Sequence, residues 1–219
     1  MQKTEEWTAE WLREKSHTFM RAMSYYRCAM MEIETKFNVL NQEYMLAYDW
    51  NPISTIKTRL KTLPSIERKL QKKGLPMTLE AMEQNLTDIA GVRVICPFPD
   101  DVYRLAESFL LQDDIVLLEK KDYIRNPKPN GYRSLHLVVE IPIFLTKEKR
   151  MMKAEIQLRT IAMDCWASLE HQLRYKKDVP FTEEMGRELE ECARLSADLD
   201  RRMDQLRSDV ERIRREERE

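Results

Sequence analysis

The side chains best suited to chemistry gather in one turn and in the strand predicted to follow it. The segment NPKPNGYRSLHLVVEI, Asn126 to Ile141, places two prolines, an Asn-Gly pair and Tyr132 directly before a strand-like run. A plain hairpin needs only the Asn130-Gly131 pair, because that dipeptide tolerates positive φ. The additional polar side chains therefore predict that this turn binds a ligand.

Tyr132 is predicted to be a platform for a nucleobase. It lies on a rigid turn beside Lys128, Asn130 and His136, so its flat ring is flanked by hydrogen-bonding groups, which suits a base with its phosphates nearby. The alternative is a structural tyrosine that closes the end of the sheet.

Three predicted strands each collect polar side chains on one face. The three sets are Lys57, Arg59 and Lys61; Lys153, Glu155, Gln157 and Arg159; and Tyr132, Ser134 and His136. A solvated face of an antiparallel sheet would explain each strand alone. Taken together, so many cations beside the single carboxylate of Glu155 favour a surface that binds anions.

A second carboxylate, Asp88, is expected at the entrance of the apolar strand that contains Gly91 and Arg93. An aspartate in such a place is often only a cap or a turn former. If Asp88 and Glu155 lie on adjacent strands, however, they form an oxygen-ligand site for Mg²⁺, the ion that joins protein carboxylates to substrate phosphates.

A second cationic series runs off a predicted strand onto a helix, at Arg59, Lys61, Ser65 and Lys69. Ser65 follows Pro64 near the start of the helix, where free backbone N–H groups attract phosphate, and Lys69 lies one turn further along the same face. A solvated helix face is the alternative for Lys69.

The scaffold that positions these groups is predicted to be an α+β domain with a sheet of about five strands. The expected strands are 53–61, 90–98, 115–123, 133–141 and 152–160, and the expected short helices are 65–74, 78–86, 100–110 and 160–177, with Thr78 as a cap. The fold is therefore a mixed sheet flanked by helices.

Long helices are predicted at both ends of the chain. Apolar residues recur in steps of three and four from Phe19 to Tyr44, in a helix that should end near Asp49 before Asn51-Pro52, and again from Leu199 to Ile213. Each apolar stripe either packs against the chain's own core or forms a seam with another subunit.

Composition limits the class of protein. The 219 residues carry a formal net charge of -1 and are 42% hydrophobic and 34% charged, which fits a helix-rich globular protein with no global attraction to nucleic acid or membranes. The four cysteines form no CxxC pair, and neither a signal peptide nor an apolar run long enough for a membrane span is evident. We expect a cytoplasmic protein with reduced thiols.

Five segments, in the family's order, resemble the synthetase domain of RelA/SpoT-type enzymes. They are RxKxxxSxxxK (Arg59 to Lys69), DIAGVRV (Asp88 to Val94), KDYIRNPKPNGYRSLH (Lys121 to His136), EIQLRT (Glu155 to Thr160) and WASLEHQLRYKK (Trp166 to Lys177). With no HD-type hydrolase domain upstream and no regulatory region downstream, the chain looks like a stand-alone small alarmone synthetase. The resemblance implies a nucleotidyltransferase-like fold.

The resemblance also implies a reaction. Enzymes of this family are GTP pyrophosphokinases of stringent-response signalling, which move the β,γ-pyrophosphoryl group of ATP onto the 3′-hydroxyl of GTP or GDP. Arg59 and Arg93 would then sandwich adenine, while Lys61, Ser65 and Lys69 would hold the phosphates of ATP.

The guanine-nucleotide pocket and the metal site follow from the same resemblance. Tyr132 would stack on guanine in a pocket completed by Lys121, Lys128, Asn130, His136 and Gln157. Asp88 and Glu155 would be catalytic and would bind Mg²⁺, with Glu155 also a candidate to take the proton of the attacking hydroxyl.

The implied organisation is one synthetase domain over residues 1–219, with a helical region at 1–50, a catalytic α/β core at 51–178 and a C-terminal helix at 179–219. The implied assembly is a homotetramer, with ATP and GTP or GDP as substrates and no membrane or nucleic-acid partner.

Two other functions remain open on the sequence. Nucleotidyl transfer, in which AMP moves instead of pyrophosphate, would use the same sheet and carboxylates. A non-catalytic nucleotide sensor or RNA-binding module would use the basic faces and Tyr132, but a protein that only binds polyanions gains nothing from the central carboxylates of Asp88 and Glu155.

Overall fold

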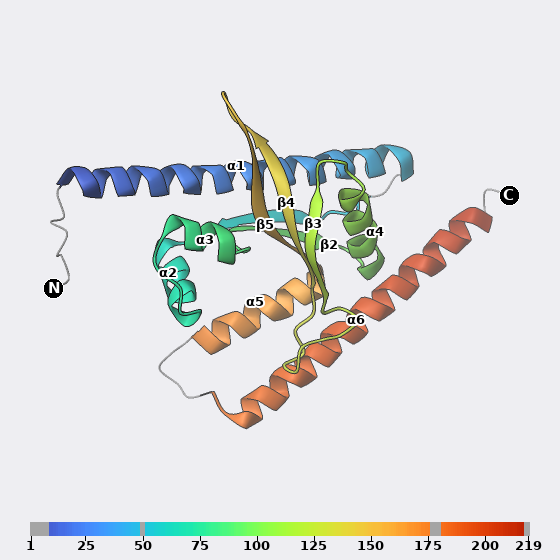
Figure 1. The fold of residues 1–219 in the computed structure, drawn as a ribbon. Helices are drawn as coiled ribbons and strands as arrows, with labels where there is room; N and C mark the ends of the chain where they lie inside the picture. The colour runs from blue at the N-terminus through green and yellow to red at the C-terminus, as the bar shows by residue number, and fades with distance from the viewer. Residues whose placement is uncertain (1–8, 49–50, 176–180, 217–219) are drawn as a thin grey trace.

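The computed structural model describes residues 9–48, 51–175 and 181–216, which form an α+β fold with one sheet (Figure 1). The elements in chain order are α1 (Ala9–Tyr48), β1 (Thr55–Leu60), α2 (Leu63–Lys72), α3 (Leu79–Asn85), β2 (Ala90–Cys96), α4 (Pro99–Leu110), β3 (Val116–Asp122), β4 (Leu135–Phe144), β5 (Lys149–Thr160), α5 (Ile161–Tyr175) and α6 (Glu183–Glu216).

The sheet has five strands in the order β1-β2-β5-β4-β3. β2 and β5 pair in parallel, and the other neighbouring pairs are antiparallel. The predicted mixed sheet flanked by helices, with long helices at both ends, is therefore confirmed. Strand bounds differ from the predicted ones by at most about three residues, and the start of β2 and the end of β5 are as predicted.

One face of the sheet is apolar and is covered by α1 and α4. Val94 of β2, Leu137 of β4 and Ile156 of β5 are fully buried on this face. Phe37 of α1 and Phe109 of α4 stack on each other with ring centroids 4.6 Å apart. Burial of such side chains away from water is the main force that holds helices onto a sheet.

The apolar stripe of α1 belongs to this core. Its members Tyr26, Met30, Ile33, Phe37 and Leu40 are all buried against the chain's own sheet and α4. Of the two alternatives left open for this stripe, the structure therefore shows the one in which it packs within the chain. The predicted end of the helix near Asp49 lies outside the described residues, as does the predicted domain boundary at 178 and 179.

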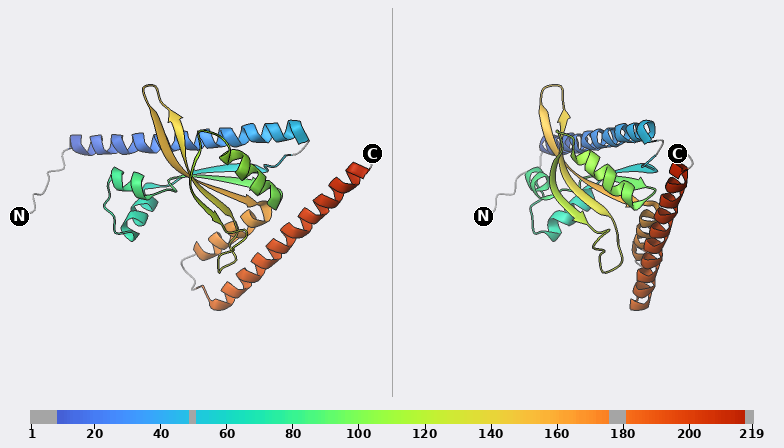
Figure 2. Two further views of the ribbon diagram at one scale, coloured as in Figure 1. Left: turned by 45° about the vertical axis from the view of Figure 1, so that its right-hand side comes forward. Right: turned by 90° about the vertical axis from the view of Figure 1, so that its right-hand side faces the viewer.

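The apolar stripe of α6 is different, because it faces away from the core. Leu199, Met203, Leu206, Val210 and Ile213 are each between 46% and 57% exposed. Figure 2 shows α6 running diagonally past the sheet, with its carboxyl end extending beyond the other elements on that side. None of the described helices has the length and apolarity needed to cross a membrane.

Polar contacts attach α6 to α5, to β5 and to the turn before β4. Trp166 donates its indole N–H to the carbonyl of Leu189 over 2.9 Å. Arg133 and Thr160 both donate to the buried carboxylate of Asp200, each over 3.0 Å. α6 therefore abuts the polar turn of 126–134, where Gly131 packs against Ala193.

Gly131 generates a prediction about this contact. Its φ is 84°, and a Cβ there would lie 2.3 Å from the Cβ of Ala193. We expect Gly131→Ala to destabilise the protein through both backbone strain and overpacking, by about 2 kcal/mol more than strain alone.

Gly74→Ala is the matched control, because Gly74 also has a positive φ, of 67°, but no atom within 4 Å of the added Cβ. Urea unfolding of both variants measures the difference. Equal free energies of unfolding for the two would show that the turn moves freely away from α6.

Candidate active site

The second face of the sheet is polar, and strand register aligns its side chains into rows. One row crosses all five strands and consists of Lys57, Arg93, Gln157, His136 and Lys121, each paired with the next across a strand boundary. The adjacent row contains Arg59, Gly91 and Glu155. Directly paired residues point to the same face, so this surface gathers the predicted site residues of β1 to β5.

Two clefts open on this polar face, and they meet at the two predicted carboxylates. The larger has a volume of about 630 Å³ and the smaller about 230 Å³. α5 forms one wall of the larger cleft, and Lys69, Lys121, Lys128 and His136 line the smaller one. Asp88 and Glu155 line both clefts, so a group bound in one can reach a group bound in the other at this junction.

Asp88 is held by two lysines of the predicted phosphate-binding series. Its Oδ2 accepts from Lys61 Nζ over 2.7 Å and lies 2.6 Å from Lys69 Nζ. Burial alone would raise the pKa of Asp88, but the hydrogen bonds and charges of the two lysines outweigh burial and hold the pKa below its ordinary value. Asp88 is therefore ionised at neutral pH.

Glu155 is the second ionised carboxylate. Its Oε1 lies 3.3 Å from His136 Nδ1, and its Oε2 accepts from Gln157 Nε2 over 2.9 Å. Burial favours the neutral form, but the contacts with His136 and Gln157 lower the pKa of Glu155 below its usual value.

Asp88 and Glu155 fit the requirements of Mg²⁺. The Oδ1 of Asp88 is buried without a hydrogen-bond partner among the described residues, so it is a carboxylate oxygen with an unused lone pair. Within residues 9–48, 51–175 and 181–216, no group of three or more His, Cys, Asp or Glu side chains could hold a metal ion by itself. Two carboxylates without further protein ligands are typical of Mg²⁺ sites that are completed by substrate phosphates and water.

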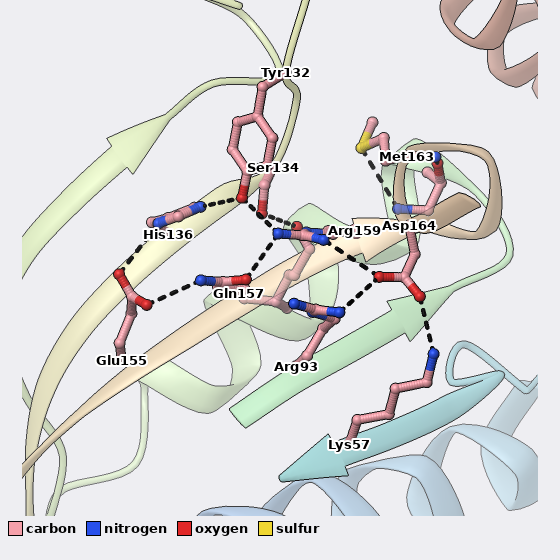
Figure 3. A network of polar contacts seen from close by, with 12 residues as sticks. Lys57, Arg93, Tyr132, Ser134, His136, Glu155, Gln157, Arg159, Met163 and Asp164 are labelled. Carbon is pink, nitrogen blue, oxygen red and sulfur yellow. Dashed lines mark hydrogen bonds and ion pairs between the residues drawn. The ribbon is translucent and has the colours of Figure 1, made fainter. Parts of the chain in front are cut away.

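Glu155 is part of a closed ring of hydrogen bonds (Figure 3). Its five members, in order, are Glu155, His136, Tyr132, Arg159 and Gln157. The Nη2 of Arg159 donates to the Tyr132 hydroxyl over 2.6 Å and to Gln157 over 2.8 Å. Two chains of hydrogen bonds thus connect one guanidinium to one carboxylate.

The direction of these hydrogen bonds follows from the charges at the two ends. Arg159 can only donate and an ionised Glu155 can only accept. In the neutral tautomer with its proton on Nδ1, His136 donates to Glu155 and accepts the Tyr132 hydroxyl proton over 2.8 Å. Each ring member is therefore satisfied, which fixes the orientation of Tyr132, His136 and Gln157 around the carboxylate.

The neighbours predicted for Tyr132 from the sequence are in place. Lys128 Nζ lies 4.9 Å from the centroid of the Tyr132 ring, and the Asn130 side chain accepts from the backbone N–H of Tyr132 over 3.2 Å. Arg159 also lies near the ring, 5.1 Å from its centroid. The turn thus presents an aromatic ring surrounded by cations, as a base and its phosphates require.

The two clefts do not divide the predicted residues into one set for ATP and another for the guanine nucleotide. Tyr132 and Gln157, expected on the guanine side, line the larger cleft together with Arg59 and Arg93, whereas Lys69, expected on the ATP side, lines the smaller one. Ser65 and Asn130 line neither cleft. Ser65 instead lies in the first turn of α2, where its hydroxyl is 2.9 Å from that of Thr62.

Sequence reasoning missed two residues of the polar network of the site, Arg159 and Asp164. The sequence places Arg159 on the polar strand face but indicates no role for it. Asp164, in the first turn of α5, accepts from Lys57, Arg93 and Arg159 over 3.0, 3.1 and 3.3 Å. No local pattern marks Asp164, because its partners lie on three different strands.

Comparisons with known proteins identify relatives of this chain. Residues 58–179 match the family model described as "Region found in RelA / SpoT proteins". Over 186 residues, which are 85% of this chain and 89% of the relative, the sequence is 44% identical to GTP pyrophosphokinase YwaC of Bacillus subtilis (strain 168).

Solved structures share the fold. A crystal structure of the small alarmone synthetase 1 from Bacillus subtilis bound to its product pppGpp has a TM-score of 0.80 at 33% identity, over 88% of this chain and 98% of that one. A second structure of the same synthetase, bound to AMPCPP, has a TM-score of 0.76 at 31% identity, over 90% of this chain and 99% of that one.

Proposed function

The chain belongs to the RelA/SpoT family, whose model it matches over more than half of its length, and we propose that it is a GTP pyrophosphokinase. It transfers the β,γ-pyrophosphoryl group of ATP to the 3′-hydroxyl of GTP or GDP and forms pppGpp or ppGpp with AMP. The observation that carries the proposal is the meeting of two clefts at Asp88 and Glu155. A two-substrate reaction needs such a junction, and a simple nucleotide sensor does not.

On the ATP side, the adenine ring lies between Arg59 and Arg93, which are on adjacent strands and line the same cleft. Lys61 and Lys69 hold the phosphates, with Ser65 at the start of α2 as a further donor. Both lysines converge on one oxygen of Asp88, so they already point toward the place where the phosphates and Mg²⁺ are expected. A relative with this fold has been solved bound to AMPCPP, which supports nucleotide binding by the fold.

On the acceptor side, Tyr132 stacks on guanine while Lys128 and His136 lie along the ribose and phosphates. Lys121 lines the same smaller cleft as these two residues. Gln157 and Asn130 support the pocket through Glu155 and through the backbone of Tyr132 respectively.

Mg²⁺ bound by Asp88 and Glu155 would supply positive charge to the phosphate oxygens during transfer. The acceptor 3′-oxygen forms a bond to the β-phosphorus of ATP, and the bond between that phosphorus and the oxygen bridging to the α-phosphate breaks, releasing AMP. Glu155 takes the proton of the hydroxyl, since it is ionised and held in place by His136 and Gln157. The cations of the polar face stabilise the polyphosphate charge.

The reaction products test the proposal directly. Incubation with ATP, GTP and Mg²⁺ should yield AMP and pppGpp in equal amounts, measured by chromatographic separation of the nucleotides. Release of inorganic pyrophosphate with AMP joined to the acceptor would instead show nucleotidyl transfer. Nucleotide binding without any product would show a sensor.

The two carboxylates should be indispensable for turnover. We expect Asp88→Asn and Glu155→Gln each to lower pppGpp formation by at least about 100-fold, because each removes a charge without changing size. Glu83→Gln is the control, since Glu83 pairs with Arg150 and lines neither cleft. Near-normal turnover of either active-site variant at saturating Mg²⁺, with an unchanged melting temperature, would disprove the metal site.

Tyr132 should matter to the guanine nucleotide more than to ATP. Tyr132→Ala is expected to weaken GTP binding by about 1 to 3 kcal/mol, with a smaller effect on ATP. Tyr132→Phe separates two roles, because it keeps the stacking surface but loses the hydroxyl contacts with His136 and Arg159. Calorimetric titration of each variant gives both affinities, and equal losses for GTP and ATP would assign Tyr132 to the framework of the sheet.

The exposed α6 stripe supports a homotetramer. Leu199 and Met203 also line an apolar groove of about 580 Å³ between α5, α6 and Phe98, so the uncovered surface continues beyond the helix itself. Surfaces of this kind favour association between identical chains. Each active site lies within one chain, on the face of the sheet away from α1.

Charged substitutions on this stripe should divide the assembly. Leu206→Glu with Val210→Glu is expected to reduce the molar mass measured by light scattering at micromolar concentration. Arg201→Glu, on the opposite side of α6, should leave it unchanged. A monomeric mass for the wild type would refute the tetramer.

A further inference from the structure

We propose that Asp164 is a positioning residue for ATP, which acts by fixing Arg93 in the orientation that binds adenine. The inference rests on the proposed function and extends it to a residue outside the family-derived set of site residues. It is carried by the convergence of three cations from three different strands on one carboxylate, and all three of these cations line the larger cleft.

Asp164 contacts three cationic side chains. Its Oδ2 accepts from Lys57 Nζ over 3.0 Å, and its Oδ1 accepts from Arg93 Nη1 over 3.1 Å and from Arg159 Nη1 over 3.3 Å. The side chains of Asp164 and Arg159 are 10% and 5% exposed, so their ion pair is shielded from solvent, whereas Lys57 is 56% exposed and Arg93 is 34% exposed. The carboxylate is therefore coupled more strongly to the two arginines than to Lys57.

The backbone of Asp164 is also fixed. Thr160, the last residue of β5, accepts the N–H of Met163 with its hydroxyl over 3.1 Å, which anchors the first turn of α5. The same hydroxyl donates to Asp200 of α6. Asp164 therefore presents its carboxylate from a turn that is tied to β5 on one side and to α6 on the other.

Removing the negative charge would leave like charges in close proximity. Burial and the neighbouring Arg159 both lower the pKa of Arg93, whereas the charge of Asp164 raises it. Burial opposes ionisation of Asp164, but Lys57, Arg93 and Arg159 together lower its pKa. Without this carboxylate, Arg93 and Arg159 would repel each other and separate.

Loss of the Asp164 charge should change the orientation of Arg93 more than that of Arg159. Arg159 keeps its hydrogen bonds to Tyr132 and Gln157 through Nη2 when Asp164 is neutral. Arg93 has Asp164 as its hydrogen-bond partner, and its Nε has none among the described residues. Arg59, on the other side of the proposed adenine site, is exposed. Of the two arginines at the proposed adenine site, Arg93 is therefore the one held in place, and its hydrogen bond to Asp164 holds it.

The test is calorimetric binding of a non-hydrolysable ATP analogue and of GDP, each with Mg²⁺, to the wild type and to Asp164→Asn. We expect the dissociation constant for the ATP analogue to rise about tenfold or more, the usual scale for loss of a charged hydrogen bond, and that for GDP to change by less than about threefold. Asp164→Glu should recover part of the loss. Asp198→Asn, which changes a partly exposed α6 carboxylate paired with Arg201 and Arg202, should change neither constant.

A double-mutant cycle separates positioning from a structural role. If Asp164 acts through Arg93, Asp164→Asn should have little further effect on ATP-analogue binding in an Arg93→Gln background. Additive effects in the cycle, or equal weakening of ATP analogue and GDP together with a lower melting temperature, would overturn the inference. So would normal ATP-analogue binding by Asp164→Asn.

Nucleotide binding and pppGpp formation by the wild type distinguish failure of this inference from failure of the proposed function. A wild type that binds both nucleotides and makes pppGpp, with a normal Asp164→Asn variant, overturns only the role of Asp164. A wild type that binds neither nucleotide overturns both.

Discussion

The parallel pairing of β2 with β5 is the constraint on which the site depends. Its register places Gly91 opposite Glu155 and Arg93 opposite Gln157, and it brings Asp88, just before β2, near a carboxylate far along the chain. Since strand side chains alternate, a slip of one residue would turn Glu155, Gln157 and Arg159 into the apolar core. The buried face under α1 and α4 prevents that slip, so the packing of the core also secures the chemistry.

Charge balance is the second organising feature of the polar face. Lys61 and Lys69 hold Asp88, Arg159 connects by two hydrogen-bond chains to Glu155, and further cations surround Asp164. On the proposed function, polyphosphate and Mg²⁺ enter a site where the carboxylates of Asp88, Glu155 and Asp164 already have partners. Binding therefore exchanges partners at Asp88 instead of exposing unpaired charges, which keeps the cost of reorganisation small.

The sequence predicted much of this arrangement and missed its cross-strand parts for a clear reason. Alternation along single strands was enough to place Lys57 and Arg59 together on one face of their strand and Glu155 and Gln157 together on one face of theirs. The polar turn was enough to single out Tyr132. The parallel register of β2 and β5 could not be read from either strand alone. Arg159 and Asp164 were missed because their importance arises from contacts between β1, β2, β5 and α5. The exposure of the α6 stripe, as opposed to the buried α1 stripe, likewise depends on tertiary packing, since both show the same periodicity.

The central claim is that two nucleotides meet at Asp88 and Glu155. A crystal structure of the Glu155→Gln variant with ATP, GDP and Mg²⁺ tests it most directly. The account predicts adenine between Arg59 and Arg93, guanine against Tyr132, and the 3′-hydroxyl of GDP facing the β-phosphorus of ATP beside Asp88. A complex in which the acceptor hydroxyl faces the α-phosphorus, or in which the two nucleotides occupy sites that do not meet at these carboxylates, would contradict it.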